Sequence, residues 1–149
     1  MKNYFITSGS GTSAYKLVAF DNALLAAGIS NYNLVRVSSI LPAGCAKQQS
    51  VDVTFASPLH TAYATVSSNR QGEHIATAIA AGIPKDSEDI GIIMEAEGET
   101  SDETEERVRN MVVEAMHNHG IELDHVESSS IEGVVEDGFL SLISAISMW

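Results

Sequence analysis

Two adjacent serines, Ser38 and Ser39, carry the most specific chemistry that this sequence offers. They end a strand-like run that turns before a proline, Asn33-Leu-Val-Arg-Val-Ser-Ser-Ile-Leu-Pro42. Attack of the Ser39 hydroxyl on the Ser38 carbonyl would convert the peptide bond between them into an ester. Elimination from that ester, followed by hydrolysis, would leave a pyruvoyl group at residue 39. The pair therefore predicts an electrophilic ketone made from the chain itself.

A serine pair is a weak signal on its own, because Ser67-Ser68 and Ser128-Ser129-Ser130 repeat it elsewhere. The strand-like run before Ser38-Ser39 and the proline after it distinguish this pair from the others. A ketone of this kind withdraws electrons as pyridoxal phosphate does, so no lysine is needed to hold a cofactor. None of the four lysines stands out as a site for pyridoxal phosphate. The sequence therefore predicts a pyruvoyl enzyme without pyridoxal phosphate.

Other chemically active residues indicate no second site. His117 and His119 diverge on a helix, and adding His125 gives no metal-ligand spacing, so no metal is expected. Gly9 and Gly11 are too loosely spaced for a phosphate-binding loop, and no lysine follows at the required offset.

Composition limits the partners and the compartment. The 149 residues carry a net charge of −12, from eight Lys and Arg against twenty Asp and Glu. This balance disfavours nucleic acid and anionic membranes and would attract a small cation, although solubility alone also explains it. A single cysteine, Cys45, and an N-terminus without an apolar signal segment favour the cytoplasm.

Helical elements are expected in three places. Apolar spacing predicts a helix over 17–27 that ends at Gly28, and a capping box at Thr100 predicts another over 100–119. The alanine-rich segment 73–81 also favours a helix.

Strands are expected over 4–7, 33–39, 51–55, 61–67, 89–97, 121–135 and 139–148. Residues 8–13 are typical of a loop, and Asp137-Gly138 predicts a hairpin turn between the last two strands. The last segment also admits a helix. Mixed helices and antiparallel strands predict an α+β fold in one domain over residues 1–149.

Four segments together resemble the pyruvoyl-dependent arginine decarboxylases. The resemblance covers about residues 17–149, and the Ser-Ser and Ile-Met-Glu elements are its specific parts. The segments are Ala19-Phe-Asp-Asn-Ala-Leu-Leu-Ala-Ala-Gly-Ile29, Asn33-Leu-Val-Arg-Val-Ser-Ser-Ile-Leu-Pro42, Ile83-Pro-Lys-Asp86 and Gly91-Ile-Ile-Met-Glu-Ala-Glu-Gly98.

This resemblance implies a four-layer helix-sheet-sheet-helix sandwich that assembles as a homotrimer with active sites between protomers. It also implies cleavage between Ser38 and Ser39 into a β fragment, residues 1–38, and an α fragment, residues 39–149. L-arginine would then be decarboxylated to agmatine, an entry to polyamines.

The resemblance also assigns roles to single residues. Ser39 is the pyruvoyl precursor, and Glu95 is the acid that protonates the α-carbon of the substrate after carbon dioxide leaves. Glu97, on the same side of the strand, could raise the Glu95 pKa by repulsion. Asn33 assists self-cleavage as a donor to the Ser38 carbonyl. Asp21 and the new carboxylate of Ser38 bind the guanidinium of arginine.

Two stretches depart from the family pattern. Ser57-Pro-Leu-His-Thr-Ala-Tyr-Ala64 replaces a Pro-x-Ala-Tyr-Gly type of sequence, and the loop after Pro42 is short and polar. Two alternatives therefore stay open at this point. One is a pyruvoyl decarboxylase for another amino acid such as histidine. The other is an uncleaved, non-enzymatic assembly subunit.

Overall fold

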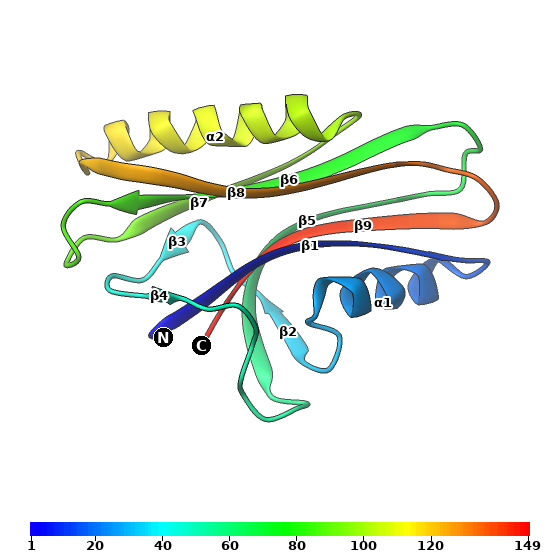
Figure 1. Cartoon of the computed structure of the whole chain (residues 1–149), viewed down its shortest axis with the longest axis horizontal. Helices are drawn as coiled ribbons and strands as arrows, with labels where there is room; N and C mark the ends of the chain where they lie inside the picture. The colour runs from blue at the N-terminus through cyan, green and yellow to red at the C-terminus, as the bar shows by residue number, and fades with distance from the viewer.

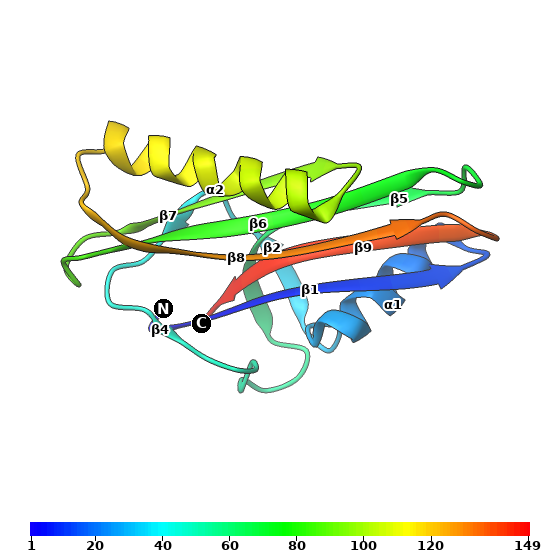
Figure 2. The ribbon, with the colours of Figure 1, turned by 45° about the horizontal axis from the view of Figure 1, so that its top comes forward.

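Two β-sheets lie face to face, and one helix covers the outer face of each (Figure 1). The computed structural model describes residues 1–149. Helix α1 (Lys16–Ala27) packs on the five-stranded sheet, and helix α2 (Ser101–Asn118) packs on the four-stranded sheet. Figure 2 shows the same four layers after a turn of the molecule. This arrangement confirms the α+β helix-sheet-sheet-helix sandwich.

The five-stranded sheet, called sheet A, has the order β2-β5-β9-β1-β4. Its β1–β9 and β5–β9 pairs are antiparallel, whereas the short β2 and β4 pair parallel to their neighbours. Strand β1 thus lies inside the sheet, between β9 and β4. The strands are β1 (Asn3–Ser13), β2 (Asn33–Arg36), β4 (Ala46–Lys47), β5 (Pro58–Ser68) and β9 (Phe139–Met148).

The four-stranded sheet, called sheet B, is antiparallel throughout and has the order β3-β7-β6-β8. The helix predicted over 73–81 is wrong, because this segment is the central strand β6 of the sheet. Its alanines are buried on both faces, and this tertiary packing overrides their helix propensity. The strands are β3 (Ile40–Leu41), β6 (His74–Pro84), β7 (Gly91–Gly98) and β8 (Leu123–Val134).

Helix α1 approaches sheet A unusually closely because both surfaces are made of small residues. The buried alanines Ala19, Ala23 and Ala27 recur every fourth residue and face β1. A Cβ atom on Gly9 would lie only 2.6 Å from the backbone nitrogen of Ala27, and Gly11 is equally crowded. The loop predicted over 8–13 is therefore wrong, since these glycines lie within β1 and admit the helix.

Helix α2 follows its sequence prediction. The Thr100 side chain accepts a hydrogen bond from the Glu103 backbone N–H, as an N-cap residue should. Val108, Val112 and Met116 are buried against sheet B. Neither helix of the chain is long and apolar enough to cross a membrane.

Between the two sheets, apolar clusters flank a small network of hydroxyl groups. Ser8 of β1 contacts Ser129 of β8 at 2.7 Å and Ser144 of β9 at 2.8 Å, and Thr77 of β6 contacts Ser144 at 2.8 Å. Thr77 and Ser144 are fully buried. These hydrogen bonds join the two sheets and fix the position of one against the other. A purely apolar layer between the sheets would not do so.

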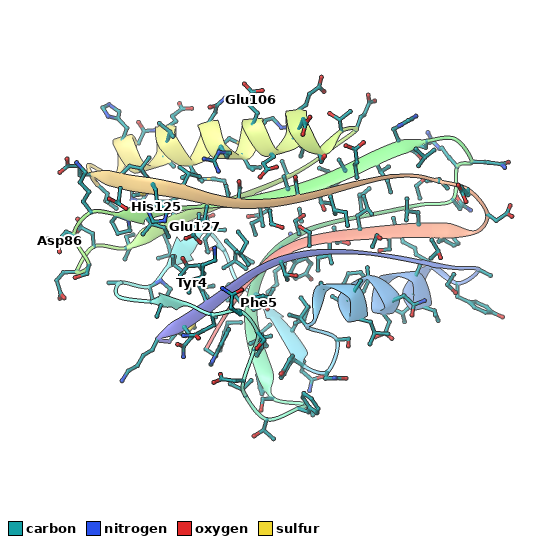
Figure 3. The ribbon with its side chains drawn as sticks, viewed as in Figure 1. Tyr4, Phe5, Asp86, Glu106, His125 and Glu127 are labelled. Atoms are coloured by element: carbon teal, nitrogen blue, oxygen red, sulfur yellow. The ribbon has the colours of Figure 1, made fainter.

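A charged cluster joins the sheets at one end. Glu127 of β8 accepts a hydrogen bond from the hydroxyl of Tyr4 at 3.0 Å, and it contacts Lys47 at 3.1 Å and His125 at 3.2 Å. Figure 3 shows Tyr4, His125 and Glu127 together between β1 and β8. Burial opposes the charge on Glu127, but these three partners outweigh it and hold the pKa of Glu127 below its usual range.

Three further predictions need correction. Residues 51–55 form no strand, and the strand predicted over 33–39 ends at Arg36 as the exposed edge of sheet A rather than a buried strand. Asp137-Gly138 forms no hairpin, because β8 and β9 belong to different sheets. The strand predicted over 139–148 is confirmed as β9, so the alternative of a helix there is excluded.

Candidate active site

The Ser38–Ser39 peptide is the point where the chain crosses from sheet A to sheet B. On one side, the Val37 N–H donates to the carbonyl of Thr61 in β5 at 3.2 Å; on the other, the Ser39 carbonyl accepts from the Ile93 N–H of β7 at 2.7 Å. The Ser38 carbonyl accepts no hydrogen bond, and Ser38 is exposed. The bond is thus anchored at both ends, while its carbonyl stays open to attack.

Glu95 lies at the same corner, on β7. It is two residues beyond Ile93, so both side chains point to the same face of sheet B, toward sheet A. Glu95 is half-buried. Burial raises the pKa of its carboxyl, and the positive charge of Arg36 opposes part of that effect. A raised pKa is a property that suits a carboxyl to the role of proton donor.

Glu97 takes no part in this effect, contrary to the sequence-based expectation. The causes of the raised Glu95 pKa are burial and Arg36, and repulsion from Glu97 is not among them. Glu97 is exposed and lines a separate cavity of about 620 Å³ at the other end of β7, together with Glu73 and His74.

Asn33 lies at the other end of β2 from the serine pair. Its side-chain amide donates to the carbonyl of Ala56 at 2.6 Å. Ala56 is the only non-glycine residue with a positive φ, 66°, so Asn33 supports a strained turn. Arg36 is three residue steps along the strand from Asn33, which is roughly 10 Å. The single chain does not bring the Asn33 amide to the Ser38 carbonyl.

Asp21 is exposed on α1 and is likewise not brought to Ser39 by its own chain. It shares the outward face of the helix with Leu17 and Leu25, which are 77% and 57% exposed. Sheet A lies between this helix and the corner that holds Glu95 (Figure 1). Asp21 is also beyond the first turn of α1, which contains no acidic residue, so interaction with the helix dipole does not explain it.

An apolar depression of about 260 Å³ adjoins Ser38. It is lined by Met1, Val37, Ser38, Ile40, Pro42 and Met148. Ile40 and Met1 are 42% and 53% exposed. The depression offers room beside the serine pair for the aliphatic part of a small molecule or for a side chain of another copy.

Two residues of this corner were missed from the sequence. Arg36 donates to the carbonyl of Tyr63 at 3.0 Å, and its guanidinium carbon lies 4.5 Å from the centre of the Tyr63 ring. Arg36 stands two residues before Ser38, which was an available signal. No such signal pointed to Tyr63, because its proximity to Arg36 depends on the parallel pairing of β2 with β5.

The protein is thus an α+β sandwich that carries a serine pair where the chain crosses between its sheets and a half-buried carboxyl on the adjoining strand β7. A family model described as pyruvoyl-dependent arginine decarboxylase matches residues 3–148. The chain belongs to the pyruvoyl-dependent arginine decarboxylase family, a family of enzymes, as its sequence predicted.

Individual relatives agree with the family model. A pyruvoyl-dependent arginine decarboxylase from Thermococcus kodakarensis is 39% identical over 150 residues, 99% of this chain and 95% of the relative. One from Methanocaldococcus jannaschii is 41% identical over 132 residues, 88% of this chain and 80% of the relative. One from Pyrococcus abyssi is 34% identical over 151 residues, 99% and 95% of the two chains.

Proposed function

We propose that this protein cleaves its own chain between Ser38 and Ser39 and then decarboxylates L-arginine to agmatine and carbon dioxide, in the cytoplasm. The observation that carries the proposal is the corner between the sheets, where an anchored serine pair with an open carbonyl adjoins the half-buried Glu95. The names of the relatives support arginine as the substrate.

Self-cleavage needs only the serine pair and water. The Ser39 Oγ attacks the Ser38 carbonyl carbon, and the peptide nitrogen leaves as the free amine of an ester-linked intermediate. Loss of a proton from the Ser39 α-carbon then expels Ser38 as a carboxylate and leaves dehydroalanine. Water converts the dehydroalanine to the pyruvoyl ketone and releases ammonia. The products are residues 1–38 and residues 39–149.

The surroundings of Ser39 fit a pyruvoyl group. The hydrogen bond from the Ile93 N–H already holds the carbonyl that would lie next to the ketone, at 2.7 Å. The ketone would supply an electron sink for the bond between the substrate α-carbon and its carboxylate. Glu95 holds the proton that the substrate α-carbon receives after carbon dioxide has left.

The guanidinium of arginine would be bound by Asp21 and by the new carboxylate of Ser38. Because sheet A separates Asp21 from Glu95 in one chain, Asp21 must come from a neighbouring copy. The exposed Leu17 and Leu25 that flank Asp21 favour such a contact, since a second copy would cover them. A trimer with its sites between protomers satisfies this requirement. If Asn33 assists self-cleavage, its amide must likewise reach the Ser38 carbonyl from a neighbouring copy, because its own chain does not bring the two together.

Intact-mass measurement of the purified protein tests the proposal directly. We expect two polypeptides, 1–38 and 39–149, with the larger one reactive toward phenylhydrazine. Ser39→Ala should give one uncut chain and no agmatine. The Glu95→Gln protein should be cut normally, but its turnover should fall by about 10²–10⁴-fold. The matched control Glu97→Gln should keep the wild-type turnover.

Two results would defeat the proposal. A single uncut wild-type chain that phenylhydrazine does not modify would indicate an uncleaved, non-enzymatic assembly subunit instead. Release of carbon dioxide from histidine in preference to arginine, in a comparison of basic amino acids, would retain the chemistry and reject the substrate.

A further inference from the structure

One ion pair of this structure joins the two sheets. Lys47 of β4, in sheet A, lies 3.1 Å from Glu127 of β8, in sheet B. The same Glu127 oxygen accepts the hydrogen bond from the Tyr4 hydroxyl at 3.0 Å. Tyr4 is 3% exposed and the Glu127 side chain 18%, so these contacts are partly shielded from water, where they are stronger than at the surface. Lys47, Glu127 and Tyr4 are called the clasp below.

The clasp holds one end of a short segment that begins at the proposed cut. This segment, residues 39–47, is called the strap. Its strand β3 pairs with β7 through only two residues, Ile40 and Leu41. The chain then turns and returns to sheet A as β4, where Lys47 pairs with Tyr4 of β1 (Figure 1). The strap therefore spans both sheets and is fastened to each.

The Ser39 end of the strap is weakly held by its own strand. Beyond the two paired residues of β3, the bond from the Ile93 N–H to the Ser39 carbonyl, at 2.7 Å, is the hydrogen bond that fixes residue 39. Short segments with few contacts open locally at little cost in free energy. Tyr4, Leu41 and Ile93 belong to one buried apolar cluster, so the ring whose hydroxyl binds Glu127 shares the core on which β3 and β7 pack.

We propose that the three clasp residues are positioning residues for self-cleavage: by fixing the far end of the strap, they keep the Ser39 hydroxyl within reach of the Ser38 carbonyl. The inference rests on the proposed function in that it takes the bond between these serines as the one that is cut. Attack requires the reacting atoms to approach to about 3–3.5 Å in a defined orientation, and a misplacement of about 1 Å can cost about 10²-fold in rate. The clasp acts through the strap and takes no part in the chemistry.

The first test measures the hold on residue 39 directly and needs no cleavage. In the uncut Ser39→Ala protein, hydrogen–deuterium exchange of the Ile93 amide, followed by NMR, reports how often its bond to the residue 39 carbonyl opens. Lys47 is 44% exposed, and Lys47→Met leaves Glu127 its contacts with Tyr4 and His125. The Ile93 amide should then exchange about 5–30-fold faster, while amides between β5 and β9 keep their rates. Lys47→Arg keeps the charge and should keep the slow exchange.

The matched control is Lys2→Met, the same charge change on an exposed residue just before β1 and outside the clasp. Its Ile93 exchange should equal that of the Ser39→Ala parent. The inference is overturned if Lys47→Met accelerates this exchange no more than Lys2→Met does. If Lys47→Met does not fold, Tyr4→Phe carries the test, because it removes one bond of the clasp and keeps the ring. An unchanged Ile93 exchange in that protein overturns the inference equally.

The second test follows self-cleavage in protein that retains Ser39. After a pulse of cell-free synthesis, the fragment 39–149 is measured against time by denaturing electrophoresis. Lys47→Met should be cut about tenfold more slowly than wild type or slower still, whereas Lys47→Arg and Lys2→Met should be cut at the wild-type rate. A merely structural role would lower the urea midpoint and leave the cleavage rate of the folded protein unchanged, which overturns the inference.

The two proposals fail in different ways. Wild-type protein that is never cut would reject the proposed function and this inference together. Wild-type protein that is cut, with Lys47→Met cut equally fast, would overturn this inference alone.

Discussion

Substitution of Gly9 by alanine should separate helix α1 from sheet A. An added Cβ would lie 2.6 Å from the Ala27 backbone nitrogen and 3.0 Å from the Ala27 Cβ, with the Ala23 carbonyl also in the way. Gly9 has no positive φ, so alanine itself suits this position in β1. The whole effect is therefore steric.

The expected magnitude follows from these contacts. Non-bonded heavy atoms pack best at about 3.5–4.0 Å, so α1 must retreat by about 1 Å. Because the obstacles are backbone atoms and short side chains, no side chain can rotate away. Overpacking of this kind costs about 1–3 kcal/mol. With a urea dependence of about 2 kcal/mol per molar, the unfolding midpoint should fall by about 0.5–1.5 M.

The assay is urea unfolding at one protein concentration, with every variant in the Ser39→Ala background so that each is a single chain. Ser10→Ala, on the next, exposed residue of β1, is the control and should match the parent. In cleavable protein, displacement of α1 also moves Asp21, so the KM for arginine should rise while self-cleavage continues. A Gly9→Ala protein with unchanged midpoint and KM would refute the close helix–sheet contact.

Three further predictions concern stability. Tyr4→Phe removes the hydrogen bond to Glu127 at 3.0 Å and should cost about 1.5–3 kcal/mol in urea unfolding; a change below about 0.5 kcal/mol would contradict the bond. Thr100→Ala should cost about 0.5–2 kcal/mol through loss of the N-cap of α2, whereas Thr100→Ser should not. Hydrogen bonds to Asp124 and Glu127 raise the pKa of His125, so its stabilising effect is complete below about pH 6.5 and is lost as the pH rises through the folded-state pKa. The stability difference between wild type and His125→Gln should therefore be larger in acid than in base, and a pH-independent difference would argue against it.

Sequence patterns predicted the elements that have one dominant signal. Helix α2 has a cap and an apolar face, and α1 has a glycine stop, Gly28, with a positive φ of 77°. The candidate site could be proposed from the sequence, because Ser39 and Glu95 stand in recognisable segments. The proximity of Ser39 to Glu95 could not be predicted, because it depends on the pairing of β3 with β7. Strand β3 is only two residues long.

Two of the failures, the helix predicted over 73–81 and the loop predicted over 8–13, share a physical cause, which is the demand of close packing between layers. Alanine in β6 and glycine in β1 are poor strand formers by propensity. Both are small, however, and so allow the neighbouring layer to pack closely against the strand. A Cβ on Gly82 of β6 would lie 2.6 Å from the Val112 side chain of α2. A single sequence does not reveal which small residues face a helix, so local propensity predicted a helix and a loop in their place.

Strand β1 has ten residues in register with β9 and lies between that strand and β4. It precedes Ser38, whereas both of its neighbours follow Ser39, so the proposed cut would divide one sheet between two polypeptides without releasing either. A newly made chain inserts β1 within one molecule. Once cut and denatured, it would depend on a chance encounter between two partners to do so again. If the chain is cut as proposed, folding must come before maturation, and a mature enzyme that unfolds would not easily be recovered.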